Sequence, residues 1–236
     1  MYKMPYARKY TRKTYKKRNF RKRTTLNSKI ARIAKTVALR QAETKHRINN
    51  YDWRTLYHNS STRLTQNILQ TGQGTNDGPT NSRIGDEIIL RGLKLNFIFR
   101  HFYDRPNLTF KVWVLKAAYT NLGSTLPVKT GSMGNLLIDP ISTEKCTVLA
   151  NRTYKYNHGN YTKQDGDVAV SKEITYTRKI WIPFKNLKYS YDNNDGYHGK
   201  WFSVAVYVAA YDTYGTLITD QVGSIAATGE IFFKDP

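Results

Sequence analysis

From residue 62 to the end of the chain, apolar and polar side chains alternate with a period of two. Leu93, Leu95 and Phe97, for example, alternate with Lys94 and Asn96. A period of two places successive side chains on opposite faces of a β-strand, whereas a helix repeats every 3.6 residues. Because no helical period is sustained in this region, we predict that it is built from strands.

Two further runs show the same alternation. In the first, one parity holds Phe110, Val112 and Val114, and the other holds Lys111, Trp113 and Leu115. In the second, one parity holds Ile174, Tyr176, Ile180 and Ile182, and the other holds Thr175, Thr177, Lys179 and Trp181.

Clusters of Gly, Asn, Asp and Pro separate the alternating runs, as in TGQGTNDGP at residues 71 to 79. Such clusters favour turns and stop strands. The pattern predicts eight strands, near residues 62–70, 87–102, 108–119, 146–157, 172–183, 186–191, 200–212 and 225–234. Eight antiparallel strands without a helical layer favour an all-β, two-sheet sandwich. A single jelly roll is the commonest eight-stranded form, but period and turns leave the connectivity open.

Positive charge is concentrated at the N-terminal end. Residues 1 to 47 hold 17 Lys and Arg and one acid, Glu43, a formal charge of +16; residues 48 to 236 hold 21 basic and 16 acidic residues, or +5. We therefore expect three parts: a basic arm at residues 1 to 27, a helix at residues 28 to 47, and a sandwich domain at residues 48 to 236.

The arm is expected to be disordered and to bind nucleic acid. Its first 23 residues carry eleven cations, no acid and almost no aliphatic side chain, so burial cannot offset the entropy of ordering. Cations placed against phosphates release counterions, which gives salt-sensitive binding that is largely independent of base sequence. A solvated tail is the alternative. The predicted contacts are Lys3, Arg8, Lys9, Arg12, Lys13, Lys16, Lys17, Arg18, Arg21, Lys22 and Arg23.

Aromatic side chains interrupt this basic run every four or five residues. The exposed bases of a single strand stack on such rings, so we predict stacking on Tyr6, Tyr10, Tyr15 and Phe20. The segment KKRNFRKR is also typical of a nuclear localisation signal, and host import machinery is an expected partner. The import residues are Lys16, Lys17, Arg18, Arg21, Lys22 and Arg23.

A helical period follows the arm. Ile30, Ile33 and Val37 recur at helical spacing and form a narrow apolar stripe. We expect a short basic amphipathic helix that docks this stripe on the body or on copies of itself. A membrane-surface helix shows a similar pattern, but this stripe lacks Trp and Phe. The predicted nucleic-acid contacts on the helix are Lys29, Arg32 and Lys35.

The chain shows no arrangement typical of an enzyme. Its five histidines are scattered without metal-ligand spacing, and the single Cys146 can form neither an internal disulfide nor a Cys-based zinc site. No apolar run approaches the roughly 20 residues that span a bilayer. We expect no catalytic residues, no metal site and no cofactor, although divalent ions between subunits remain open.

The segment TQNILQTGQGTNDGPTNSRIGDEIILRGLKLNF, residues 65 to 97, resembles part of a known capsid fold. It is similar to the end of the first jelly-roll strand, the following loop and the turn into the next strand in coat proteins of the satellite tobacco necrosis virus type. It also resembles the coat proteins of small circular, Rep-encoding single-stranded DNA viruses. The matching Arg-x-Gly-Asp pattern is carried by Arg83, Gly85 and Asp86. Residues 146–157, 178–184 and 201–212 resemble the corresponding later strands in order.

This resemblance implies a capsid protein that self-assembles into a T=1 shell of 60 identical subunits, with the arms inside around single-stranded nucleic acid. DNA is favoured over RNA as the cargo. The implied location is the virion, and the host nucleus and cytoplasm during assembly, without membrane insertion. Two alternatives remain: a cellular jelly-roll binding module, such as a lectin or a nucleic-acid chaperone with a basic targeting tail, and an enzyme of the cupin type with a metal cluster in its strands.

Overall fold

The structure is a computed structural model that describes residues 26–73, 82–83, 85–102, 105, 107–157, 174–192, 199–213 and 217–235. The chain divides into two compact units, with the boundary between Ala38 and Leu39. The arm cations, aromatic residues and import residues predicted between positions 3 and 23 lie outside the described residues.

The predicted N-terminal helix is present as α1 (Leu26–Gln41). It begins two residues before the expected position and ends six residues before it, because the chain enters a strand at Lys45. Residues 45 to 47, which we predicted as helical, pair instead with the C-terminal strand, Lys45 opposite Phe233. The Lys45 Nζ also donates a hydrogen bond to Asp235 Oδ2 at 2.6 Å. Pairing with a distant strand therefore overrides the local helical pattern.

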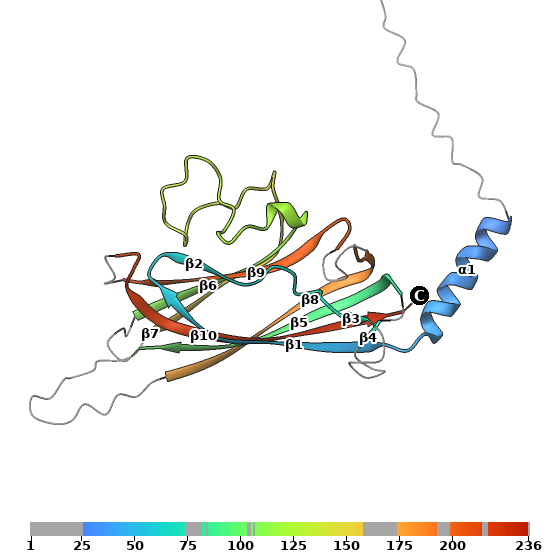
Figure 1. The fold of residues 1–236 in the computed structure, drawn as a ribbon, viewed down its shortest axis with the longest axis horizontal. Coiled ribbons are helices and arrows are strands. Elements are labelled where there is room, and N and C mark those ends of the chain that lie inside the picture. Colours follow the sequence, from blue (N-terminus) through green and yellow to red (C-terminus); the bar gives the residue numbers. More distant parts are fainter. Residues whose placement is uncertain are drawn as a thin grey trace, which may run out of the picture. The chain divides into compact units, whose positions relative to one another are not determined.

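Eight strands form two four-stranded antiparallel sheets (Figure 1). The first, named here the open sheet, has the order β1-β10-β5-β8, and the second, the covered sheet, has the order β2-β9-β6-β7. The open sheet contains β1 (Lys45–Tyr57), β10 (Gln221–Lys234), β5 (Glu87–His101) and β8 (Ile174–Ser190). The covered sheet contains β2 (Ser60–Thr65), β9 (Ser203–Asp212), β6 (Asn107–Ala117) and β7 (Thr147–Asn157). The short elements are β3 (Gly72–Gln73), β4 (Ser82–Arg83) and the 3-10 helix η2 (Tyr119–Asn121).

This strand order is that of a jelly roll. The first and last strands, β1 and β10, pair in one sheet, while the second and second-last, β2 and β9, pair in the other. Nested pairing of this kind is the double Greek key of an eight-stranded jelly roll. The predicted single eight-stranded antiparallel jelly-roll sandwich is therefore confirmed, and the connectivity that the sequence left open is established.

Two of the predicted strand assignments are wrong, although the total of eight is correct. Residues 45 to 57, for which we expected no strand, form β1, where a register shift between Tyr51 and Arg54 interrupts the alternation. Conversely, the two strands expected at 172–183 and 186–191 are the single strand β8, which continues through a bulge at Lys185 and Asn186. Both irregularities hide a continuous strand from a period-two search.

The strand assigned to the start of residues 65 to 97, the segment that resembles capsid proteins, also needs a correction. Thr65 ends β2, the second of the eight long strands, and not the first. Residues 65 to 97 therefore run from the end of the second long strand, through β3 and β4, into β5.

The main core lies between the two sheets, where Leu95, Phe97, Phe110, Val206 and Ile231 are at most 1% exposed. A second apolar cluster lies on the other face of the covered sheet. There Trp113, Leu115 and Tyr207 pack against residues of the loop 118–146, which lies over this sheet in Figure 1. Because both of their faces are buried, β6 and β9 read as nearly continuous apolar runs.

Candidate nucleic-acid interface

The outward face of the open sheet exposes large apolar and aromatic side chains. Ile48 and Trp53 from β1, Ile98 from β5 and Trp181 from β8 are all exposed. Arg100 lies over the Trp53 ring, with its Cζ 4.9 Å from the ring centroid. Exposed apolar side chains grouped with cations are typical of a binding surface rather than of a solvated sheet face.

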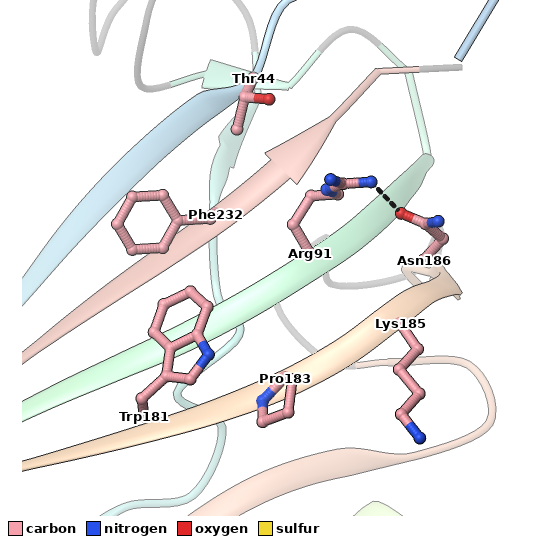
Figure 2. A pocket seen from close by; sticks show the side chains of 7 residues that line it. All are labelled: Thr44, Arg91, Trp181, Pro183, Lys185, Asn186 and Phe232. Carbon is pink, nitrogen blue, oxygen red and sulfur yellow. Dashed lines mark hydrogen bonds between the residues drawn. The ribbon is translucent and has the colours of Figure 1, made fainter. Parts of the chain in front are cut away.

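A pocket of about 440 Å³ opens beside this face (Figure 2). Its lining residues are Thr44, Arg91, Trp181, Pro183, Lys185, Asn186 and Phe232. The volume lies within the range of about 300 to 1,000 Å³ that is common for small-ligand sites. None of the seven lining residues is acidic and two are cations, so the pocket favours an anionic ligand.

The indole of Trp181 forms the aromatic wall of the pocket. It lies over Gly92 on the neighbouring strand, where a Cβ would come within 2.2 Å of the indole Cη2. On its other side, the Phe232 ring meets it edge-on, with centroids 5.5 Å apart and planes at 63°. A glycine is thus required at position 92, and the indole is held in place while 54% of Trp181 remains exposed.

The opposite wall is built by the bulge in β8. Leu90 pairs with Leu187 and Gly92 pairs with Pro183, so three residues of β8 lie opposite Arg91 alone. Within this bulge, Lys185 and Asn186 adopt left-handed backbone conformations, with φ of 51° and 63°. A bulge redirects side chains relative to a regular strand.

The bulge places an amide beside the cation. Asn186 Oδ1 accepts a hydrogen bond from Arg91 Nη1, which orients the guanidinium along the pocket. Lys185 extends away from Arg91 past Pro183 (Figure 2). The pocket therefore has an aromatic wall at Trp181, an oriented guanidinium, and a second cation at its margin.

The predicted helix contacts are placed as follows. Lys29 and Arg32 are exposed on α1, and Lys35 lies in the same helix, with its side chain outside the described part of the chain. The apolar stripe of Ile30, Ile33 and Val37 is 45 to 61% exposed. Nucleic-acid binding by these cations stays a prediction.

The Arg-x-Gly-Asp pattern forms a turn into β5 that is held by a buried arginine. Arg83 is 1% exposed, and its Nη1 donates hydrogen bonds to Gly85 O and, at 3.0 Å, to Asp86 Oδ1. Its guanidinium lies 3.9 Å from the ring centroid of Tyr191. Gly85 has a φ of +83°, which favours glycine. Because the guanidinium is enclosed, it anchors the turn and is not accessible to a phosphate.

Tyr191 links this turn to the segment after β2. Its backbone N–H donates to Asp86 O at 2.8 Å, and its hydroxyl donates to Leu69 O at 2.8 Å and accepts from Thr71 Oγ1 at 2.7 Å. Burial raises the pKa of this hydroxyl well above its ordinary value. The tyrosine therefore remains a neutral hydrogen-bonding group at physiological pH.

The pocket residues Arg91, Trp181, Asn186 and Phe232 were not among the predicted site residues. Of these residues, Trp181 could have been identified from the sequence. It lies on the same parity of its alternating run as Lys179 and Thr177. That parity is the outward one, so an exposed ring could be expected from the period alone. Its position over Gly92 depends on strand register and has no local sequence signal.

The described residues contain no group of three or more His, Cys, Asp and Glu side chains that could hold a metal ion. Cys146 is buried in the second apolar cluster, on the outer face of the covered sheet, and burial raises the pKa of its thiol. Within the described part of the chain, no helix is both long and apolar enough to cross a membrane.

No family model matches the chain, and no curated protein sequence matches it. Among solved structures, it is similar to the VP2 subviral particle of infectious bursal disease virus, with a TM-score of 0.33 and 8% identity over 81% of this chain and 38% of that chain. A structure of the Gt strain of the same virus gives a TM-score of 0.30 and 10% identity over 83% of this chain and 38% of that one. The chain thus spans well under half the length of these viral chains.

Proposed function

We propose that this chain is a viral capsid protein whose jelly-roll body builds a shell and whose basic N-terminal arm packages single-stranded nucleic acid. The observation that supports it most is the uneven distribution of charge along one chain. Residues 1 to 47 carry +16, whereas residues 48 to 236, which hold the jelly-roll body except for the first three residues of β1, carry +5. A polycationic segment condenses nucleic acid through counterion release. A nearly neutral body can pack against copies of itself without strong self-repulsion.

Exposed apolar loops support assembly of the body. Met133 and Ile138 in the loop 118–146, and Leu217 and Ile218 before β10, are more than half exposed. Large apolar side chains on loop tips are typical of surfaces that become buried in an assembly. We assign these loops to subunit contacts in a closed T=1 shell of 60 copies.

Packaging is assigned to the arm. Sixty arms, each with eleven cations and no acid, supply about 660 positive charges, enough to neutralise a large share of a kilobase-scale single strand. The aromatic residues between the cations suit unpaired bases, which favours a single-stranded cargo. DNA as the cargo, and import of the subunit into the nucleus through residues 16 to 23, complete the proposal.

The shell is tested by electron microscopy of the purified full-length protein, combined with nuclease treatment. We expect round particles of one size whose nucleic acid survives nuclease. Monomers at every salt concentration and pH would contradict the proposal.

The arm is tested by deleting residues 2 to 23. We expect shells or smaller assemblies with sharply reduced nucleic-acid content. A full-length variant with the eleven arm cations replaced by glutamine serves as a matched control, because it keeps the arm length and removes only the charge. Unchanged nucleic-acid content in both variants would show that the arm does not package the nucleic acid.

One observation favours a second candidate, a cellular jelly-roll binding module such as a lectin. Trp53, Trp181 and Trp201 are exposed, and sugar rings pack against exposed aromatic faces as bases do. Glycan binding without particle formation would support this candidate over a capsid protein.

A further inference from the structure

We propose that the pocket at Trp181 is a nucleotide-binding site of the jelly-roll body, with one base of a single strand stacked on the Trp181 indole and the adjoining phosphate bound by Arg91. The proposal rests on the proposed function in one respect, since it takes the packaged single strand as the ligand. The arm binds through many charges and no fixed position, whereas the pocket is one defined site on the jelly-roll body.

The indole presents a face of suitable size and fixed orientation. The indole rests directly on the strand at Gly92, which has no side chain to lift it, and the Phe232 ring beside it limits its rotation. More than half of Trp181 nevertheless remains exposed. Bases of any sequence stack on such a ring, and preorganisation lowers the entropy lost on binding.

The guanidinium of Arg91 supplies the matching phosphate contact. Asn186 uses one of its N–H groups, which leaves other donors of the planar fork for two phosphate oxygens. Among the described residues, neighbouring Lys94 and Lys188 form ion pairs with Glu230 and Glu87, at 3.0 Å and 2.7 Å, whereas no carboxylate pairs with Arg91 or Lys185. Among the described residues, the charges of Arg91 and Lys185 are therefore not neutralised by a carboxylate and can attract a phosphate.

The backbone of the bulge gives independent support. Left-handed conformations are unfavourable for residues other than glycine, and two of them occur in succession at Lys185 and Asn186. Such conformations persist where surrounding structure imposes them, and they are concentrated at ligand sites. Here they place the Asn186 amide against Arg91, across the pocket from Trp181.

The pocket also adjoins the point where the basic segment of the chain ends. Thr44 lines it, and β1 begins at Lys45. The 43 residues before Thr44 carry 15 Lys and Arg and one acid. A single strand held by those cations is thereby kept at high effective concentration near Trp181.

The site is tested by photo-crosslinking the full-length protein to a short single-stranded oligonucleotide that carries 5-iodouracil, followed by peptide mapping. We expect a crosslink at Trp181 in addition to crosslinks in residues 1 to 23. Crosslinks in the arm without one at Trp181 overturn the pocket and leave the proposed function intact; crosslinks in neither region count against both. Equal crosslinking at Trp201, an exposed indole outside the pocket, shows unspecific contact and also overturns the pocket.

A salt series separates stacking from phosphate contact. For oligothymidine binding, Trp181→Ala should weaken affinity about fivefold or more at every salt concentration and leave the slope against log salt unchanged. Arg91→Gln should reduce that slope by about 0.7. Trp181→Phe should restore most of the affinity, while Trp201→Ala should have no effect.

Gly92→Ala displaces the ring without removing it, so it should weaken binding as Trp181→Ala does. Circular dichroism and thermal unfolding verify that each variant is folded. If Trp181→Ala prevents assembly but leaves oligothymidine affinity unchanged, the indole is a contact to a second copy and the nucleotide site is refuted.

Discussion

The two sheets of this jelly roll both carry a tryptophan on the face that points away from the shared core. On the covered sheet, Trp113 is fully buried because the loop 118–146 packs over it. On the open sheet, Trp181 remains 54% exposed. Outward apolar residues therefore contribute most to stability where another segment covers them. Where nothing in the described chain covers them, they are free to bind something else.

Polar side chains hold the covering loop in place. Lys111 on β6 donates from Nζ to the carbonyl oxygens of Leu136 and Leu137. Asn59, in the turn between β1 and β2, donates from Nδ2 to Gly134 O at 2.6 Å and accepts from the Leu136 N–H at 2.9 Å. The cover is thus a fixed part of the fold, because its backbone groups are paired with strands and turns beneath it.

The largest expected effect comes from removing the two outward indoles in turn. Trp113→Ala should lower the free energy of unfolding by about 3 to 5 kcal/mol, because it opens a cavity beneath the loop. Trp181→Ala should lower it by only about 1 to 2 kcal/mol, because roughly half of that ring is already in water. Urea unfolding of the two variants measures the difference. Equal losses would mean that the open face is covered in the folded protein.

An intermediate effect is expected from removing one lysine on each sheet. Burial lowers the pKa of Lys111, with nearby Asp139 acting in the opposite direction, so this amine bears a desolvation cost that its carbonyl partners offset. Lys111→Met should destabilise the protein by about 1 to 3 kcal/mol, since two loop carbonyls lose their donor.

The matched control for Lys111 is Lys94→Met on the open sheet. Lys94 pairs with Glu230 at a half-exposed position, so its loss should cost less than about 1 kcal/mol. Limited proteolysis at residues 118–146 should become faster in Lys111→Met and remain unchanged in Lys94→Met. Faster cleavage in both would mean that the loop responds to global stability and is not held locally by Lys111.

The smallest effect concerns alkaline pH and the core that both sheets share. Burial raises the pKa of Tyr51 to about 12, against an opposing hydrogen bond with Thr65 of the covered sheet. Because the folded-state pKa lies above the unfolded value near 10, the stability that Tyr51 contributes is present below pH 10 and is lost as pH rises toward 12. The loss should be about 1 kcal/mol at pH 11.

Urea midpoints at pH 8 and pH 11 measure this effect. Tyr51→Phe should show a smaller decrease between the two pH values than the unchanged protein. Tyr57→Phe, at an exposed position on the same strand, controls for loss of a hydroxyl. An identical decrease in Tyr51→Phe would exclude Tyr51 as the responsible group.

The all-β fold class could be predicted from the local alternation of apolar and polar side chains. The wrong strand assignments lie where that alternation is interrupted. The run around Leu95 predicted β5 closely because every inward residue meets the same core. By contrast, β1 was missed at its register shift, and β8 was divided at Lys185 and Asn186, where a bulge leaves the strand intact but breaks its period. The parity that holds Lys111, Trp113 and Leu115 has two large apolar residues, but we did not predict from it that the loop 118–146 covers this face.

By itself, the sequence determined the charge division at residue 47, the strand-forming body and the turns, since each depends on neighbours along the chain. Only the tertiary structure decided the order of strands, the sheet that is covered, and the position of Trp181 over Gly92 beside Arg91. Those features depend on register and packing between residues far apart in the chain. The alternation of neighbouring side chains does not indicate which distant residues will pair or pack together.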